Sequence, residues 1–126
     1  MRVRIYYHHT DCGGVVYYAR YLEFLEAART EFLEERGILI KELIKQGVVF
    51  VVSRQEIDYK SPAFYGDILQ IDTQLTNTSG VRLEFEYEIK NQSGKLIATA
   101  ETVMASMSCA LKPKPIPEEV REKLLK

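Results

Sequence analysis

The sequence predicts an α+β domain in which a curved antiparallel sheet of about five strands wraps around one long helix. Residues 17–36 carry apolar side chains at helical spacing. Most of residues 48–111 alternate between apolar and polar side chains, which is typical of strands with one buried face. The length of 126 residues and the hydrophobic share of 46% suit a single domain, residues 1–126, with a substantial core.

The first elements are predicted to be a short strand and the long helix. At residues 2–7, Val3 and Ile5 alternate with arginines, as in a strand. The helix is expected at residues 17–36, with Gly37 as a left-handed stop. Apolar side chains cover much of its circumference, so it must be covered on more than one side. These side chains are Tyr21, Leu22, Phe24, Leu25, Ala28, Phe32 and Leu33.

Four strands are expected after a shorter helical segment at residues 40–46. They are predicted at residues 48–60, 69–75, 81–90 and 95–111. The pattern is clearest in the third, where apolar residues alternate with charged ones. The apolar residues there are Val81, Leu83, Phe85, Tyr87 and Ile89. Turn-forming residues connect the strands at residues 61–67, 77–80 and 91–94.

The chain is expected to end in a short amphipathic helix at residues 118–126. Prolines within residues 112–117 stop the sheet, because proline cannot donate to a ladder. One long apolar helix and one antiparallel sheet bury each other only when the sheet curls around the helix, which is the hot-dog arrangement. A single unit leaves sheet edges open, so we expect two copies to pair edge to edge in a homodimer.

Composition excludes several classes of function. The net charge is −1, from 17 basic and 18 acidic residues, so no overall basic field attracts nucleic acid or a membrane surface. No segment approaches the ~20 apolar residues of a membrane span, and the amino end lacks the apolar run of a signal peptide. We therefore expect a cytoplasmic protein. Cys12 and Cys109 lack CxxC spacing and are expected to be free thiols.

The residues with the clearest chemical potential gather just before the long helix. Asp11 precedes the glycine pair Gly13-Gly14, and glycine lets the backbone approach a ligand closely. A helix start presents unpaired N–H groups with a partial positive charge. An acid and a site that stabilises an anion are therefore expected to be neighbours.

This segment resembles the hot-dog acyl-CoA thioesterases related to 4-hydroxybenzoyl-CoA thioesterase. It is most similar to the small bacterial subfamily linked to the Tol-Pal cell-envelope system. The residues that carry the resemblance are Thr10-Asp11-Cys12-Gly13-Gly14-Val15-Val16-Tyr17, Tyr21, Phe24, Glu26, Ala27-Ala28-Arg29, Glu31, Val49-Phe50-Val51-Val52, Tyr59-Lys60-Ser61-Pro62-Ala63 and Gly66-Asp67.

The resemblance implies hydrolysis of an acyl-CoA thioester at a site between two subunits, with no metal or redox cofactor. It also implies a tetramer of paired dimers. Asp11 matches the family's catalytic aspartate, and Tyr18 matches the residue whose backbone N–H polarises the thioester carbonyl. The bacterial subfamily commonly has histidine at this position, whereas the hydroxybenzoyl enzyme has tyrosine. Only a role for the backbone N–H therefore carries over to Tyr18.

Two chemical roles are open to Asp11. It can attack the carbonyl to give a mixed anhydride, or it can act as a base on water. The N–H groups from Val16 to Tyr18 are the expected oxyanion donors. A structural role for Asp11, capping the turn before the helix, is the alternative.

Substrate contacts are expected from the same loop and from basic residues elsewhere. Gly14, Val16 and Tyr17 are predicted to approach the substrate. Lys60 and Arg82 are the candidates for the coenzyme A phosphates, with Lys112 and Lys114 as further candidates; the alternative for each is solvated surface charge. Several aromatic residues are expected to divide between the core and the acyl pocket: Tyr7, Tyr17, Phe50, Tyr59, Phe64 and Tyr65.

Other reactive residues favour structural interpretations. His8 and His9 are adjacent on the expected strand and should point to opposite faces, which disfavours a shared metal ion. One of them is expected to orient Asp11 or to line the pocket. Cys12 is interpreted as a small residue beside the turn glycine. Carboxylates on the long helix, Glu26 and Glu31, match the catalytic position of another hot-dog branch, although Glu26 can instead form an ion pair with Arg29.

Two other functions compete with thioester hydrolysis. A hydroxyacyl dehydratase of the same fold relies on a characteristic histidine, and no such motif is present. A non-catalytic module that binds acyl-CoA or acyl-carrier protein is the second alternative. The presence of Asp11 argues against it.

Overall fold

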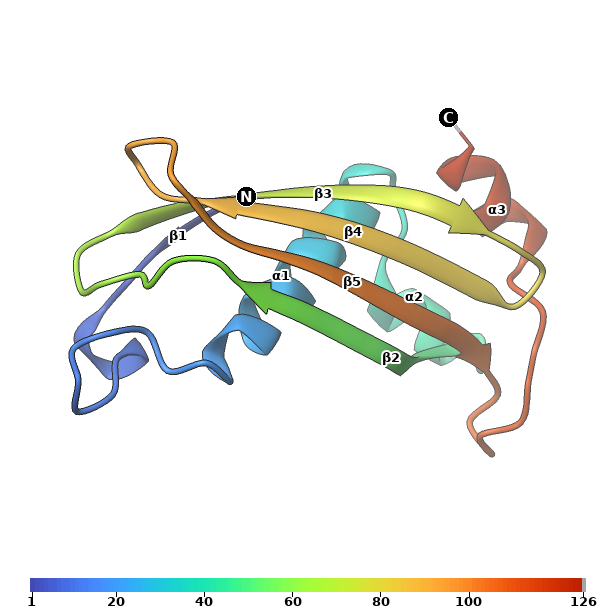
Figure 1. Ribbon diagram of the computed structural model, residues 1–126. Coiled ribbons are helices and arrows are strands. Elements are labelled where there is room, and N and C mark those ends of the chain that lie inside the picture. Colours follow the sequence, from blue (N-terminus) through green and yellow to red (C-terminus); the bar gives the residue numbers. More distant parts are fainter. Residues whose placement is uncertain (126) are drawn as a thin grey trace.

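The computed structural model describes residues 1–125 and contains one antiparallel sheet that curls around a central helix (Figure 1). The helix is α1 (Arg20–Glu35). The strands are β1 (Arg2–Arg4), β2 (Val49–Tyr59), β3 (Ile68–Thr78), β4 (Arg82–Lys90) and β5 (Leu96–Met107), in the spatial order β1-β3-β4-β5-β2. The hot-dog arrangement predicted from the sequence is confirmed.

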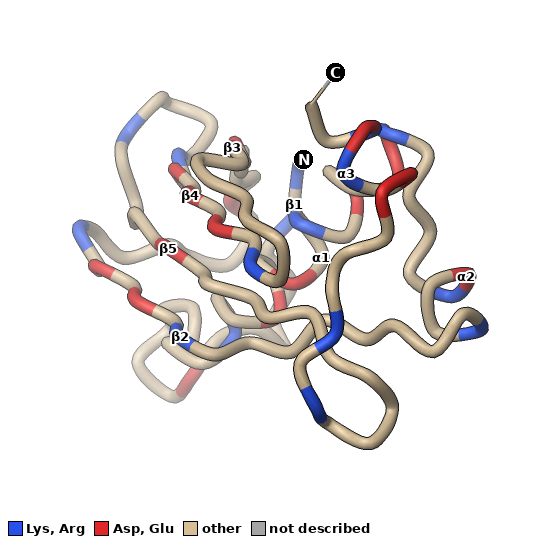
Figure 2. Tube along the Cα trace, turned by 90° about the vertical axis from the view of Figure 1, so that its right-hand side faces the viewer, with Lys and Arg blue, Asp and Glu red and all other residues tan. Residues whose placement is uncertain are grey.

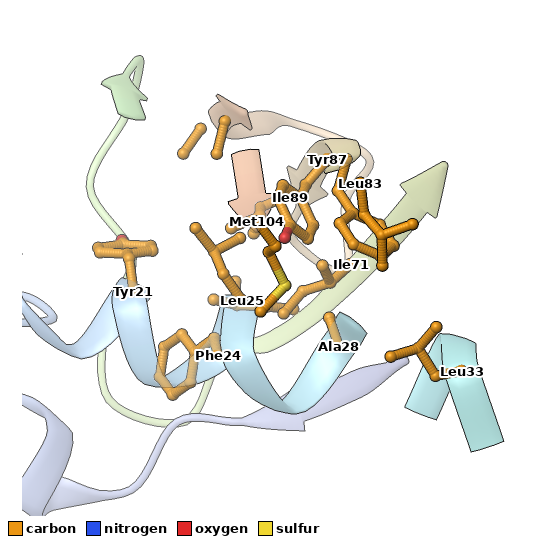
Figure 3. Close-up of a cluster of buried hydrophobic side chains, with 14 of the residues drawn as sticks. Tyr21, Phe24, Leu25, Ala28, Leu33, Ile71, Leu83, Tyr87, Ile89 and Met104 are labelled. Carbon is orange, nitrogen blue, oxygen red and sulfur yellow. The ribbon is translucent and has the colours of Figure 1, made fainter. Parts of the chain in front are cut away.

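The inner face of the sheet buries one side of α1. Tyr21, Leu25 and Ala28 of the helix point toward the sheet, and Phe24 joins them in the same buried cluster (Figure 3). Phe85 of the sheet packs edge-on against Phe32, with ring centroids 5.6 Å apart. The sheet side of the cluster includes Leu69, Ile71, Leu83, Phe85, Tyr87, Ile89 and Met104. The alternation predicted for the third strand is confirmed from Leu83 to Ile89; Val81 lies outside β4 and is exposed.

The outer face of the sheet is strongly acidic. Figure 2 shows Asp and Glu along the neighbouring strands β4 and β5 and along β2. They surround a shallow hollow on this face: Glu56, Asp58, Asp72, Glu86, Glu88 and Glu101. Because apolar residues occupy the inner positions, the charged positions of the period-two pattern all face outward.

Several boundaries differ from the sequence prediction. The first strand ends at Arg4, and residues 7–9 form a short 3-10 helix, η1 (Tyr7–His9), held by a 2.9 Å hydrogen bond from the Tyr6 N–H to His9 Nδ1. Helix α1 begins at Arg20 rather than at Tyr17. Strand β5 ends at Met107 rather than at residue 111, because the chain turns at residues 108–111, where the Leu111 N–H donates to the Ser108 carbonyl.

Two short helices complete the fold. They are α2 (Ile40–Lys45) and α3 (Glu118–Leu124). The predicted last helix was extended to Lys126, which lies outside the described residues. No helix of residues 1–125 is long and apolar enough to cross a membrane.

Strand β2 forms an open edge of the sheet. Ten of its 11 residues pair with β5 on one side, with an irregularity at Ser53, and within the described chain no strand pairs with the other side. The other edge is formed by β1, which covers only the first part of β3. One chain therefore presents a long row of unpaired backbone groups along β2.

Candidate functional site

Asp11 begins a tight loop that projects before α1. Its N–H donates to the Val15 carbonyl at 2.9 Å, and the Gly14 N–H donates back to the Asp11 carbonyl at 3.0 Å. Gly14 has a φ of 80°, in the left-handed region that favours glycine. Thr10 and Val16 form an antiparallel bridge below the loop. The segment is thus a small hairpin whose turn begins at Asp11.

The two carboxylate oxygens of Asp11 have different surroundings. Oδ1 accepts a hydrogen bond from the Gly13 N–H at 2.8 Å. A Cβ atom at position 13 would lie 3.2 Å from the same oxygen, so glycine lets the loop fold against it. Within residues 1–125, Oδ2 has neither a hydrogen bond nor an ion pair. Asp11 therefore shapes the turn with one oxygen and leaves the other free for chemistry.

The backbone N–H groups before α1 divide into two pairs. The Val16 N–H donates to the Ala63 carbonyl and the Tyr17 N–H to the His9 carbonyl, both at 2.9 Å. The expectation that these two groups serve as oxyanion donors is therefore wrong. In the described chain, the N–H groups of Tyr18 and Ala19 have no acceptor. The sequence alone did not predict a role for Ala19.

A hollow of about 310 Å³ lies beside these free N–H groups. Three predicted site residues lie in its wall: Val16, Tyr18 and Lys60. Asp11, Gly14 and Tyr17 lie in the adjoining loop and are not among its lining residues. The hollow is lined by Val15, Val16, Tyr18, Tyr21, Tyr59, Lys60, Ser61 and Pro62.

Three tyrosines line this hollow, and a fourth, Tyr17, lies in the adjoining loop. The rings of Tyr17 and Tyr18 are 4.8 Å apart, and the Tyr59 hydroxyl donates to the Tyr18 carbonyl at 3.1 Å. Burial raises the pKa of Tyr21 to about 12 and also raises the pKa of Tyr59. The hydrogen bond with Tyr18 raises the pKa of Tyr17. These three phenols therefore stay protonated at neutral pH and can act as hydrogen-bond donors.

The two histidines lie together rather than apart. In η1 the rings of His8 and His9 are 4.1 Å apart, so the expectation that they point to opposite faces is wrong. His9 packs edge-on against Phe24, and burial, followed by the charges of His8 and Arg20, lowers its pKa. Neither ring bonds to Asp11 in the described chain. Among residues 1–125 no group of three or more His, Cys, Asp or Glu side chains could hold a metal.

The basic candidates for binding phosphate do not converge within one chain. Arg82 begins β4 opposite Ala105, whereas Lys60 follows Tyr59, which pairs with Ala98 at the other end of β5. Seven residues of strand separate the two positions, roughly 23 Å. Lys114 lies at the same end as Arg82, and its ammonium group donates to the Gln46 and Gly47 carbonyls after α2. Only Lys60 lines the hollow, and its phosphate role stays a prediction.

The carboxylates of α1 are exposed and lie outside this hollow. The predicted ion pair between Glu26 and Arg29 is not present in the described chain, so that expectation is wrong. Arg29 is only 9% exposed, and its guanidinium has no hydrogen bond or ion pair with any described residue. Cys12 and Cys109 are free, as predicted.

Known proteins share both the sequence pattern and the fold. The family profile of the thioesterase-like superfamily matches residues 5–124. The acyl-CoA thioester hydrolase YbgC of Escherichia coli O6:H1 is 37% identical over 119 residues, covering 94% of this chain and 89% of that protein. The acyl-CoA thioesterase YbgC of Haemophilus influenzae is also 37% identical, covering 94% of this chain and 88% of that protein.

A solved structure agrees with these sequence matches. It is Slr0204, a 1,4-dihydroxy-2-naphthoyl-CoA thioesterase from Synechocystis, with a TM-score of 0.92 and 26% identity. The superposition covers 100% of this chain and 94% of that one. The chain therefore belongs to the thioesterase-like superfamily.

Proposed function

We propose that this protein hydrolyses acyl-CoA thioesters to free coenzyme A and a carboxylic acid, with Asp11 as the reacting carboxylate. The observation that carries the proposal is the geometry of Asp11, whose Oδ1 is held by the Gly13 N–H while Oδ2 is free within residues 1–125. The YbgC relatives are named for the same reaction. A free carboxylate oxygen in the loop that leads into two unpaired N–H groups, those of Tyr18 and Ala19, offers both an attacking group and a site for negative charge.

The reaction needs stabilisation of the oxygen that becomes negative. When a nucleophile adds to the thioester carbonyl, the oxygen becomes an oxyanion that the Tyr18 N–H can bind. The partial positive charge at the start of α1, a helix of 16 residues, adds to this stabilisation. The tetrahedral intermediate then collapses and expels the coenzyme A thiolate, which takes up a proton.

Two routes are compatible with the free Oδ2 atom. In the first, Oδ2 attacks the carbonyl carbon, a mixed anhydride forms as the thiolate leaves, and water hydrolyses the anhydride. In the second, Oδ2 removes a proton from water as the water attacks. Single turnover in ¹⁸O-labelled water distinguishes the two routes when water attacks the anhydride at the Asp11 carbonyl carbon. The label then enters Asp11 on the first route, whereas on the second route it enters only the carboxylic acid product.

Two substitutions separate the chemical role of Asp11 from its role in the turn. Asp11→Asn keeps an oxygen that can accept from the Gly13 N–H, whereas Asp11→Ala removes it. We expect both variants to lose turnover by roughly a thousandfold or more, because neither has a carboxylate. Asp11→Asn should keep the melting temperature and acyl-CoA affinity of the wild type, while Asp11→Ala should lose some stability.

The measurement is thiol release from a panel of aliphatic and aromatic acyl-CoAs, with binding followed separately by calorimetry. Wild-type-like release by Asp11→Asn would refute the assignment. Binding of acyl-CoA by the wild-type protein without any thiol release would instead favour the non-catalytic binding module.

We further propose that the active unit is a homodimer joined along β2. The unpaired edge of this 11-residue strand favours addition of a second strand. The position of Arg29 on α1 supports an interface on the same side. Phe24 packs against His9 on the β1 side, and Arg29 lies about 140° around the helix from Phe24, which turns Arg29 toward the β2 side. A second subunit could supply the carboxylate that Arg29 lacks, and could also bring its own Arg82 toward the coenzyme A phosphates.

A further inference from the structure

We propose that Tyr59 is a positioning residue, which fixes the Tyr18–Ala19 peptide group so that the Ala19 N–H joins the Tyr18 N–H in binding the oxyanion. This inference rests on the proposed thioester hydrolysis. It assigns a role to a hydrogen bond between the end of β2 and the start of α1, two positions that are 41 residues apart in the sequence.

The Tyr59 hydroxyl acts on a single peptide unit. It donates to the Tyr18 carbonyl at 3.1 Å, and this carbonyl shares a planar peptide group with the Ala19 N–H. Fixing the direction of the oxygen therefore fixes the direction of the N–H on the opposite side. The Tyr21 N–H contacts the same carbonyl at a longer distance of 3.4 Å, so Tyr59 supplies the shorter of the two hydrogen bonds.

The Ala19 N–H is available as a donor. Among the described residues it has no acceptor, and the same holds for the Tyr18 N–H, whereas the two preceding N–H groups donate to the Ala63 and His9 carbonyls. A hydrogen bond accepted by a peptide carbonyl polarises that peptide group, which strengthens its N–H as a donor. Tyr59 therefore both orients and strengthens the second donor.

Ring packing fixes the side chain of Tyr59, and hydrogen bonds to β5 anchor the backbone that follows it. Its ring packs edge-on against Tyr21 at 5.4 Å and perpendicular to Tyr18 at 6.5 Å. The N–H groups of the next two residues, Lys60 and Ser61, both donate to the Ile97 carbonyl, at 2.8 and 3.1 Å. A group supported by the end of a strand holds its partner more firmly than one on a free loop.

The first test removes only the hydroxyl. Tyr59→Phe keeps the ring contacts, and we expect kcat to fall about tenfold while KM for an acyl-CoA changes less than about twofold, because the oxyanion forms only in the transition state. Tyr87→Phe is the matched control, since it also removes one phenol hydrogen bond, from Tyr87 to Thr102 at 2.9 Å in the core. It should lower the melting temperature and leave kcat unchanged, the reverse of Tyr59→Phe.

The second test removes the donor itself. Ala19 has a φ of −72°, which proline adopts, and its N–H has no acceptor in the described chain, so Ala19→Pro deletes the donor itself. Because proline also disfavours the helical conformation of the residue before it, here Tyr18, the melting temperature and circular dichroism of this variant are measured alongside kcat. We expect kcat to fall by about a hundredfold, the usual effect of losing one oxyanion donor. Adding Tyr59→Phe to Ala19→Pro should cause no further loss, because the two act through one group.

The outcomes separate this inference from the proposed function. Wild-type kcat in Tyr59→Phe, or independent losses in the double variant, would overturn the role of Tyr59 while Asp11→Asn still abolished hydrolysis. A wild-type protein that releases no thiol from any acyl-CoA would overturn both proposals. A loss of kcat in Tyr59→Phe that is accompanied by a lower melting temperature would indicate a merely structural hydrogen bond.

Discussion

At the scale of single residues, the loop before α1 depends on two glycines for different reasons. Gly13 leaves room for the Asp11 carboxylate, since a Cβ atom would approach Oδ1 to 3.2 Å. Gly14 has open space around it and is needed for its φ of 80° instead. The position of Asp11 therefore rests on one steric and one conformational requirement within two consecutive residues.

Gly14→Ala should lower the free energy of unfolding by about 1 kcal/mol, because alanine is strained in the left-handed region. Gly80→Ala is the matched control: no atom would lie within 4 Å of its new Cβ either, and Gly80 does not have a positive φ. Urea denaturation measures both variants. Equal stability of the two would contradict the conformational argument.

At the scale of elements, the outer face of the sheet places like charges directly opposite one another. Glu101 of β5 lies opposite Glu56 of β2 on one side and opposite Glu86 of β4 on the other. A hydrogen bond with Glu56 is the main cause that raises the pKa of Glu101, followed by burial and the charges of Glu56 and Glu86; Arg54 opposes the shift. This row of three glutamates opposes sheet formation when all are ionised.

The sign of the pH dependence follows from the raised pKa. The folded state holds the Glu101 proton more tightly than the unfolded chain, so this contribution to stability is full below pH 4.5, the ordinary value, and is lost as pH rises through the raised pKa. Glu101→Gln should therefore melt at a higher temperature than the wild type near pH 7, with no such gain near pH 4.

Asp58→Asn provides the control on the same face, because Asp58 lies opposite the neutral Thr99. Melting curves at the two pH values measure all three proteins. An equal rise for Asp58→Asn and Glu101→Gln near pH 7 would indicate relief of overall charge rather than of the glutamate row.

At the scale of the whole molecule, the β2 side of one chain is where we expect a second copy to bind. The strand edge is open, and the side chain of Arg29 is only 9% exposed while its guanidinium nitrogens still reach solvent and have no ion pair within residues 1–125. An interface that covered this guanidinium would remove its charge from water, and an ion pair across the interface would offset this cost. The open edge is the geometric reason for the expected dimer, and an acidic partner for Arg29 is its electrostatic complement.

Sedimentation velocity at micromolar concentration should show a homodimer, and Arg29→Met should weaken it by tenfold or more if the guanidinium pairs across the interface. Arg121→Met, on the exposed face of α3, should leave the dimer unchanged. A monomeric wild type, in which Arg29→Met raises the melting temperature, would contradict the dimer and show that Arg29 is simply an unpaired charge.

Much of the architecture was predictable because it follows from local patterns. Alternation from Leu83 to Ile89 determines which face of β4 is buried, and the apolar stripe of α1 determines which face meets the sheet. Asp11 was identifiable as a candidate from its spacing to the glycines and from the family resemblance, and its catalytic role stays a prediction. Which N–H groups stay free at the start of α1 was not predictable, because the Val16 and Tyr17 N–H groups donate to the carbonyls of Ala63 and His9.

The remaining candidates for the site depend on contacts between distant segments. No local pattern distinguishes Tyr59 from the other exposed tyrosines, since its hydrogen bond reaches a residue 41 positions away. Arg82 is a reasonable phosphate ligand by residue type, yet the direction of β4 carries it to the far end of the sheet.

By itself, the sequence determined the hot-dog fold, the superfamily and the loop that carries Asp11, because periodicity and short motifs act through neighbouring residues. Only the tertiary structure decided which N–H groups are free, which oxygen of Asp11 is unengaged, and which tyrosine supports the start of α1. Apart from proline, every residue brings the same backbone donor and acceptor, so their use is settled by the segments that fold against them.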